Sequence, residues 1–146
     1  MSIEENKYIE DICISSDFAE LIKIRDFISD KANNFGFSDD QINKIVMAVD
    51  EACTNLIKHS NKFDKAKNIC IQVETDNKLF IVNILDDGIP FNPINYPSPD
   101  INDYLQKPKS GGLGIFIIKR VMDNISYIPS NKKTPHNILR LTKYLD

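Results

Sequence analysis

The sequence lacks the features that mark several large classes of protein. No window approaches 18 uninterrupted apolar residues, the length that indicates a membrane-spanning helix. The first ten residues carry three glutamates and no apolar stretch of the kind that secretory leaders contain. The 18 Lys and Arg residues are outnumbered by 21 Asp and Glu, and no basic run indicates a nucleic-acid-binding face. We therefore expect a cytoplasmic protein whose partners are proteins or small molecules, not nucleic acid or membrane.

Cysteine is also scarce. The chain has three cysteines, Cys13, Cys53 and Cys70, an odd number with no C-x-x-C spacing. Each falls within a segment of periodic apolar residues, where a cysteine behaves as a small apolar side chain. We expect all three to be reduced residues of the core.

The length and composition fit one ordinary domain. At 146 residues, with 42% hydrophobic and 27% charged residues, the chain is close to the globular average. A chain of this length buries roughly two-thirds of the surface that its unfolded form exposes. No internal repeat or linker divides it, so we expect a single domain over residues 1–146.

The spacing of apolar residues predicts an α+β fold. The expected order is a strand at 8–14, helices at 18–35 and 39–60, strands at 68–74 and 78–85, a helix at 114–123, and strands at 124–129 and 137–144. The strand at 78–85 is apolar almost throughout, which predicts a central strand covered on both faces. We expect a two-layer α/β sandwich, with helices on one face of a mixed, mostly antiparallel sheet.

The second predicted helix carries three polar residues in one line. Glu51, Asn55 and His59 are spaced i, i+4, i+8, so on a regular helix they share one edge of the apolar face. Side chains on such an edge can reach into a cleft between helix and sheet. Taken alone, the same spacing also fits a stripe of solvated residues.

The apolar strand at 78–85 is followed by Asp86, Asp87 and Gly88. A carboxylate at the end of a buried strand can accept a hydrogen bond from an exocyclic amine. Gly88 would let the backbone pass close to a flat ring, because it has no Cβ. Taken alone, the pair Asp87-Gly88 is also typical of a plain turn.

A cluster of glycines precedes the third predicted helix. The amides of Gly111, Gly112, Leu113 and Gly114 can approach phosphate oxygens, and a helix N-terminus adds partial positive charge. A glycine hinge before a helix is the alternative. The pattern is neither a Walker A loop nor a Rossmann fingerprint, because the P-loop Lys-Ser/Thr is missing and the glycines follow a proline-rich loop.

A long loop lies between the last two motifs. Residues 90–110 contain five prolines and no sustained period, so little regular structure is expected. Loops of this length in a compact domain are commonly functional lids. We interpret residues 92–111, approximately, as a lid.

Together, these motifs resemble the anti-sigma-factor serine-protein kinases of the histidine-kinase-like (GHKL) ATPase superfamily. The matching stretches are Asp50–His59 (DEACTNLIKH) for the N box, Asp86–Phe91 (DDGIPF) for the first glycine box, and Gly111–Asp123 (GGLGIFIIKRVMD) for the second. The likeness extends from the first helix to the last strand. Pro90 departs from it, since other branches of the superfamily often have glycine there.

The resemblance implies a role for each motif. Glu51 would be the general base, Asn55 would bind Mg²⁺ through its side-chain oxygen, and His59 would line the phosphate or ribose side. Asp86 would receive the adenine amino group, with Gly88 completing that pocket. The amides at 111–114 would hold the phosphates of ATP. The lid has no arginine, which would leave charge neutralisation to Mg²⁺, Lys107 or Lys109.

The resemblance also implies partners. It predicts a homodimeric enzyme that transfers phosphate from ATP to a serine of an anti-anti-sigma antagonist and that sequesters a sigma factor. Two alternatives stay open: a nucleotide-sensing module that binds a protein without phosphate transfer, and a free-standing phosphodonor that acts on histidine or an unrelated ATPase. The sequence contains no long dimerisation helix with a phosphoacceptor histidine, so a complete sensor kinase is not expected.

Overall fold

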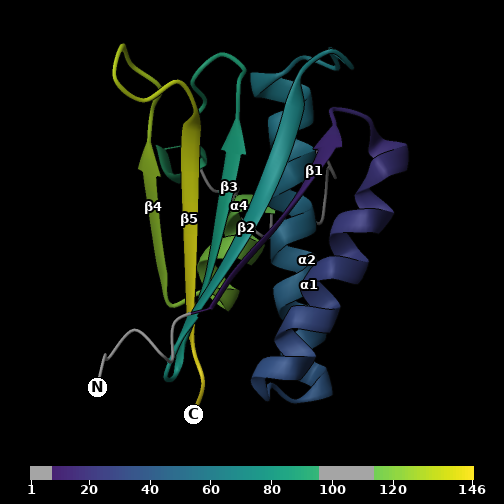
Figure 1. The fold of residues 1–146 in the computed structure, drawn as a ribbon, viewed down its shortest axis with the longest axis vertical. Helices are drawn as coiled ribbons and strands as arrows, with labels where there is room; N and C mark the ends of the chain where they lie inside the picture. Colours follow the sequence, from purple (N-terminus) through teal and green to yellow (C-terminus); the bar gives the residue numbers. More distant parts are fainter. Residues whose placement is uncertain (1–7, 96–113) are drawn as a thin grey trace, which may run out of the picture.

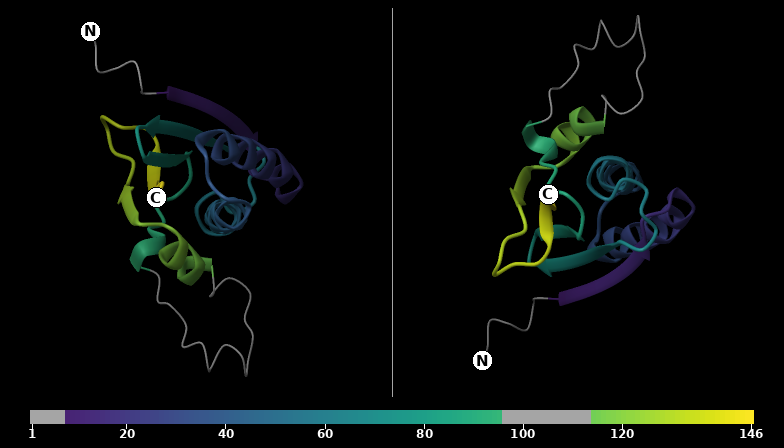
Figure 2. Two further views of the ribbon diagram at one scale, coloured as in Figure 1. Left: turned by 90° about the horizontal axis from the view of Figure 1, so that it is seen from below. Right: turned by 90° about the horizontal axis from the view of Figure 1, so that it is seen from above.

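The structure is a computed structural model that describes residues 8–95 and 114–146, arranged in two layers (Figure 1). Its helices lie on one side of a curved sheet (Figure 2). The strands are β1 (Tyr8–Ser15), β2 (Asn68–Asp76), β3 (Leu79–Asp86), β4 (Asn124–Ile128) and β5 (Asn137–Tyr144). The helices are α1 (Leu21–Phe35), α2 (Asp39–Asn55) with the π-turn η3 (Leu56–Ser60), and α4 (Gly114–Val121); short 3₁₀ turns are η2 (Phe18–Glu20) and η4 (Pro93–Asn95).

The sheet has the order β1-β2-β3-β5-β4. All four pairings between these strands are antiparallel, so the described sheet is more regular than the mixed one predicted. The predicted α+β class and two-layer sandwich are confirmed. In the β3–β5 pairing, Asp86 lies opposite Asn137 at the ends of the two strands.

The hairpin of β2 and β3 places β3 in the middle of the sheet, as predicted. Phe80 and Val82 face the helices and are fully buried. Ile81 and Asn83 point to the opposite face and are also buried. The side-chain amide of Asn83 donates to Gln72 and Glu74 of the neighbouring strand β2. The aromatic ring of Phe80 packs against Phe35 and Phe37 at 5.6 and 5.5 Å.

The two long helices begin and end where local chemistry requires. Gly36 closes α1 with φ of 111°, a left-handed conformation that glycine adopts without strain. Ser38 caps α2: its Oγ accepts from the Gln41 N–H, and the Ser38 N–H donates to the Gln41 side-chain oxygen, which completes a capping box. The apolar face of α2, including Ile45 and Val49, is fully buried against the sheet. This packing fixes which edge of α2 borders the sheet.

The cysteines require a correction. Cys53 is buried in α2 with a free thiol, as predicted, but Cys13 and Cys70 form a disulfide. These two residues are direct partners in the β1–β2 pairing. Their neighbours Ile14 and Ile69 point to the core, so the alternation of a strand turns both cysteines to the open face. The expectation of reduced core residues is therefore wrong for this pair.

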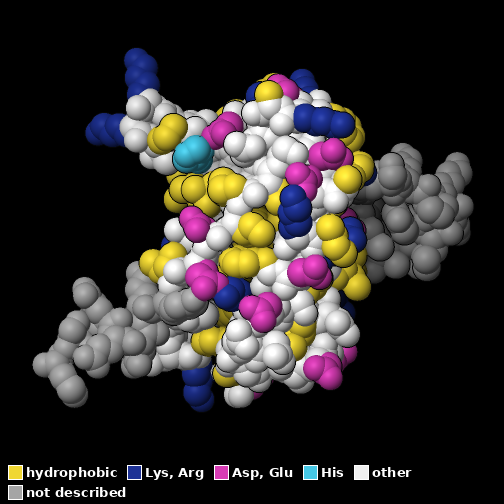
Figure 3. Space-filling view, turned by 45° about the vertical axis from the view of Figure 1, so that its right-hand side comes forward, with side chains coloured by type: hydrophobic (Ala, Val, Ile, Leu, Met, Phe, Trp, Pro, Cys, Tyr) yellow, Lys and Arg dark blue, Asp and Glu magenta, His cyan; other side chains and the backbone are white. Residues whose placement is uncertain are grey.

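The surface agrees with the mild net charge. On the face shown in Figure 3, basic and acidic side chains are interspersed and do not gather by sign. Among the helices of the described ranges, none is both long and apolar enough to cross a membrane.

Candidate functional site

Two of the predicted site residues lie one turn apart on α2. Glu51 is half-buried, and Asn55 is 5% exposed at the last position of the α-helix. Within the described ranges, the side-chain amide of Asn55 makes no hydrogen bond to protein. Both side chains lie beside the start of α4. This arrangement leaves a carboxylate and an amide oxygen available to a ligand.

The predicted line does not continue to His59. The α-helix ends at Asn55, and Leu56–Ser60 form a π-turn in which the N–H of Asn61 bonds to the carbonyl of Leu56 at 2.8 Å. This turn breaks the regular α-helical spacing after Asn55. The His59 ring stacks on Phe91, with centroids 4.7 Å apart. The helix ends at Ser60 as predicted, but its last turn is a π-turn. Contact of His59 with phosphate or ribose stays a prediction.

Asp86 closes β3 as a buried carboxylate, 2% exposed. Its Oδ2 accepts three hydrogen bonds: from Ser60 Oγ, from the Gly88 N–H at 2.9 Å and from Asn137 Nδ2 at 3.2 Å. None of these three bonds ends on Oδ1. Oδ1 is also not a fully buried atom that lacks a partner. The carboxylate therefore presents one saturated oxygen to the protein and one open acceptor.

Ser60 and Asn137 are site residues that sequence reasoning missed. Asn137 is fully buried; its Nδ2 donates to the Gly88 carbonyl at 2.9 Å, and its Oδ1 accepts from the Ser130 N–H at 2.8 Å. Ser60 is 1% exposed and also hydrogen-bonds to the Ile89 carbonyl at 2.7 Å. The sequence does not mark Asn137 as a site residue, because its position opposite Asp86 follows only from the register of β3 and β5.

Gly88 is required for a different contact from the one predicted. A Cβ at this position would lie 2.3 Å from the Ser60 carbonyl oxygen and 2.3 Å from Asn61 Oδ1. The glycine therefore lets the loop after β3 pass against the end of η3, where the Ile89 N–H bonds to the Ser60 carbonyl at 3.0 Å. Asn61 Oδ1 is itself a buried acceptor with no donor among the described residues.

The start of α4 lies over Glu51 and Asn55. We call these two residues, together with Ser60 at the end of η3, the α2 stripe. A Cβ on Gly114 would lie 2.7 Å from Glu51 Oε2 and 3.4 Å from Asn55 Nδ2. The structure thus brings the N-box residues and the last residue of the predicted phosphate motif together. Gly111, Gly112 and Leu113, with most of the predicted lid, lie outside the described residues. Gly114 alone represents that motif, at the N-terminus of an eight-residue helix.

The electrostatics of the stripe single out Glu51. Burial raises the pKa of Glu51 above its ordinary value; the charge of Asp50 adds to this and that of Lys58 partly offsets it. Asp50 is itself paired with Arg25 of α1, whose Nε lies 2.6 Å from Asp50 Oδ1. A carboxylate with a raised pKa is a stronger proton acceptor when ionised, which suits a general base.

The segment that leads into the predicted lid is held from two sides. The Phe91 N–H donates to the hydroxyl of Tyr127 at 3.0 Å, while its ring stacks on His59. Burial raises the pKa of Tyr127; the Phe91 bond opposes this shift and the charge of Asp86 adds to it. The end of α2, the loop after β3 and strand β4 are therefore linked at one place.

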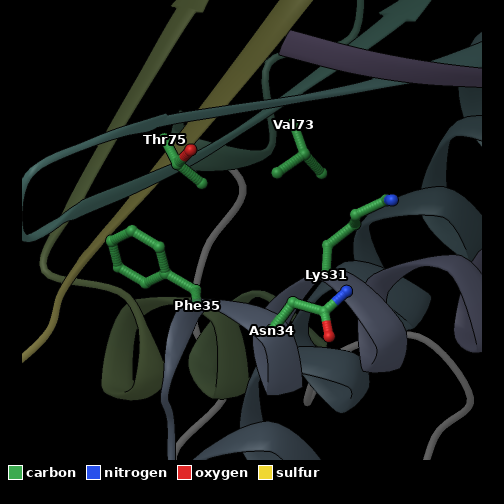
Figure 4. Close-up of a pocket in the computed structure, with 5 residues that line it drawn as sticks. All are labelled: Lys31, Asn34, Phe35, Val73 and Thr75. Atoms are coloured by element: carbon green, nitrogen blue, oxygen red, sulfur yellow. The ribbon is translucent and has the colours of Figure 1, made fainter. Parts of the chain in front are cut away.

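A separate hollow of about 240 Å³ lies between α1 and β2. Lys31, Asn34 and Phe35 line it from the helix, and Val73 and Thr75 point toward them from the strand (Figure 4). Lys31 is paired with Glu10 of β1. None of the predicted site residues lines this hollow, so it is distinct from the α2 stripe.

The family model for the histidine kinase-like ATPase domain matches residues 14–143. The match spans all three sequence motifs, the N box and the two glycine boxes. The chain belongs to this family of histidine kinase-like ATPase domains.

Curated relatives narrow the comparison to one kind of kinase. The chain is similar to the serine-protein kinase RsbW of Bacillus cereus (strain AH820), with 30% identity over 118 residues, 78% of this chain and 71% of that protein. RsbW of Bacillus mycoides (strain KBAB4) aligns with the same identity and coverage.

A solved structure agrees on the fold. The crystal structure of the RsbU and RsbW domains of Rv1364c from Mycobacterium tuberculosis matches with a TM-score of 0.63 at 12% identity. The alignment covers 94% of this chain and 32% of that one, so the chain spans about a third of its length. At this identity, the likeness supports the shared fold alone.

Proposed function

We propose that the chain is an ATP-dependent serine-protein kinase of the anti-sigma type. It phosphorylates a serine of an anti-anti-sigma antagonist. Once the antagonist is phosphorylated, the kinase is free to sequester a sigma factor. One observation carries the proposal: α2 and its π-turn contact both a buried strand-end carboxylate at Asp86 and a helix start at Gly114. The similarity to the RsbW serine-protein kinases supports the same conclusion.

The base of ATP fits at the Asp86 end. An ionised carboxylate only accepts hydrogen bonds, and the 6-amino group of adenine only donates them. Because Oδ2 is already occupied by three protein donors, the open Oδ1 is the atom that receives the amine. The triphosphate then extends along α2 toward Asn55 and Gly114.

Mg²⁺ fits as an ion that arrives with the nucleotide. The described residues contain no group of three His, Cys, Asp or Glu side chains that could hold a metal by themselves. A hard cation of this kind commonly takes a few protein oxygens and completes its shell with phosphate oxygens and water. The free amide oxygen of Asn55 is a suitable ligand. When bound, Mg²⁺ would neutralise the charge of the phosphates.

The transfer step is assigned to Glu51. Its carboxylate accepts the proton of the substrate serine as the serine oxygen bonds to the γ-phosphorus and the bond to the ADP oxygen breaks. The N–H groups at the start of α4, with those of Gly111, Gly112 and Leu113, face the phosphates. Residues 92–111 act as a lid over the nucleotide, within one domain spanning residues 1–146.

The partners follow from the same assignment. A sigma factor and its antagonist are cytoplasmic proteins, so we place the kinase in the cytoplasm. We also propose that it acts as a homodimer, the state that the family resemblance implies. Sedimentation velocity would measure that state directly, with a single species at monomer mass as the contrary result.

The experiment that tests the proposal uses γ-labelled ATP with Mg²⁺ and an anti-anti-sigma protein. We expect acid-stable label on one serine of that protein. Acid-labile label would indicate transfer to histidine. Tight ATP binding with no label on the partner would replace the kinase by a nucleotide-sensing module, and no ATP binding by calorimetry would contradict the whole proposal.

A further inference from the structure

In the π-turn after α2, Ser60 is buried and His59 is only half-buried. In a π-turn the backbone hydrogen bond runs to the fifth residue and not the fourth, so the residues after it are turned relative to a regular α-helix. Ser60 is 1% exposed and Asn55 is 5% exposed, and the N–H of Asn61 bonds to the carbonyl of Leu56. The inward stripe of this helix is therefore Glu51, Asn55 and Ser60.

We propose that Ser60 is a positioning residue that orients the Asp86 carboxylate and thereby sets the preference for a 6-aminopurine. The inference rests on the proposed binding of ATP and goes beyond it. Ser60 does not touch the nucleotide in this proposal. It acts through Asp86, whose Oδ2 accepts the Ser60 hydroxyl.

The hydrogen bonds on Oδ2 determine where Oδ1 points. The Gly88 N–H approaches Oδ2 from the loop after β3, and Asn137 Nδ2 approaches it from β5. The Ser60 hydroxyl approaches it from the end of α2, so donors from three separate elements converge on one oxygen. A carboxylate held in this way cannot exchange its two oxygens without breaking these bonds. Oδ1 is consequently kept toward the open side.

Ser60 is the donor that can be removed with the least disturbance. The Gly88 donor is backbone, and Asn137 also holds the Gly88 carbonyl and the Ser130 N–H, so its loss would disturb the loop as well. The Ser60 hydroxyl has one proton, shared between Asp86 and the Ile89 carbonyl. Its deletion removes one oxygen atom and leaves the helix backbone intact.

Loss of this bond has a chemical signature. Adenine donates its amine to Oδ1, whereas purine without a 6-substituent makes no such bond. A carboxylate that keeps only two of its three donors is less firmly oriented, so it would lose much of its advantage for adenine, whereas contacts to ribose and phosphate would not weaken. Selectivity between two nucleotides therefore separates positioning from a general loss of structure.

The test is calorimetric titration of ATP and of purine riboside 5′-triphosphate, each with Mg²⁺. A hydrogen bond to a charged group is worth about tenfold to a hundredfold in affinity, so the wild-type protein should prefer ATP by that factor. Ser60→Ala should reduce the preference to about threefold or less, mainly by weakening ATP binding. Ser60→Thr keeps the hydroxyl and should restore most of it.

Controls make the outcome specific. Ser126→Ala, at an exposed position of β4, should leave the ATP preference unchanged. Asp86→Ala should abolish the preference, and adding Ser60→Ala to it should cause no further loss, since the two residues act as one unit. If Ser60→Ala does not fold, Ser60→Cys keeps a side chain of similar size with a weak donor and should show the same reduced preference.

Contrary results are equally clear. A Ser60→Ala protein with unchanged preference, or with equal loss for both nucleotides, would overturn the positioning role while leaving ATP binding intact. Equal wild-type affinity for the two nucleotides would overturn it as well. If the wild-type protein binds neither nucleotide, the proposed function fails instead, which the same titration shows before any variant is made.

Discussion

The two ends of the α2 stripe differ in how far the protein completes their hydrogen bonds. At the Asp86 end, Ser60, Gly88 and Asn137 all donate to one carboxylate oxygen. At the Glu51 end, Asn55 makes no side-chain hydrogen bond within the described ranges, and burial raises the pKa of Glu51. Folding therefore fixes the orientation of the Asp86 carboxylate, whereas the polar groups of Glu51 and Asn55 are left available to a ligand.

Under the proposed function, this difference corresponds to two tasks, binding of the base at Asp86 and proton transfer at Glu51. Recognition of a flat base benefits from acceptors that are already oriented, because little ordering remains to be done on binding. Proton transfer instead requires a carboxylate that is not neutralised by protein donors. The comparison predicts that changes at the Asp86 end alter stability and selectivity, whereas changes at the Glu51 end alter the rate of transfer.

The largest expected effect is on catalysis at Glu51. Glu51→Gln should slow phosphate transfer by a factor of about 10²–10⁴, because a neutral amide cannot take the proton of the serine. The dissociation constant for ATP should change little. Transfer is measured with labelled ATP and binding by calorimetry, with Asp40→Asn in the exposed first turn of α2 as the control. Normal transfer by the Gln variant would show that Glu51 is not the base.

The next largest effect is on stability at Gly88. Gly88→Ala should lower the free energy of unfolding by about 3 kcal/mol, because the new Cβ meets the backbone of Ser60 at 2.3–2.4 Å and cannot move aside. Urea denaturation followed by circular dichroism measures this change. A midpoint equal to that of the wild-type protein would contradict the close packing of this loop against η3.

Gly114→Ala is the matched glycine variant at the other end of the stripe. Here the Cβ meets the end of the flexible Glu51 side chain at 2.7 Å, so the fold should tolerate it. Alanine is also favoured over glycine in a helix by up to about 1 kcal/mol. We expect unchanged or slightly higher stability with transfer slowed about tenfold, since the base is displaced. A large loss of stability would remove the contrast between the two ends.

The smallest effect is a shift in pH dependence. Glu51 must be ionised to act as a base, so transfer should fall as the pH drops through its raised pKa, at a higher pH than for an ordinary glutamate. The raised pKa also means that ionised Glu51 slightly destabilises the fold; its favourable contribution is present at low pH and is lost as pH rises through the folded-state pKa. Glu51→Gln should therefore be no less stable than wild type at pH 7, by thermal melting.

Much of the fold could be predicted from the sequence because periodicity marks local structure. The start of α2 at Asp39, the apolar strand that ends at Asp86 and the strand β2 that pairs with it all appear where the pattern indicated. Glu51 and Asn55 could be found because an i, i+4 spacing is a property of any regular helix.

Features that depend on pairing or winding could not be predicted. The line to His59 failed because the π-turn breaks the regular spacing, and no residue in Leu56–Ser60 signals that change. Asn137 and the Cys13–Cys70 pair depend on strand register, which joins positions more than fifty residues apart. The need for glycine at position 88 could not be predicted either, because it depends on the close approach of Ser60 and Asn61 in the folded chain.

The position of β5 has a consequence for a newly made chain. This strand follows the other four in sequence, yet it inserts between β3 and β4, and it supplies Asn137 to the strand-end carboxylate. During synthesis, which proceeds from the N-terminus, a nascent polypeptide would have its middle strands and helices before that insertion can occur. Nucleotide binding should therefore begin only after β5 has paired with β3 and β4. The fraction of chains that bind nucleotide would then measure the fraction that has finished folding.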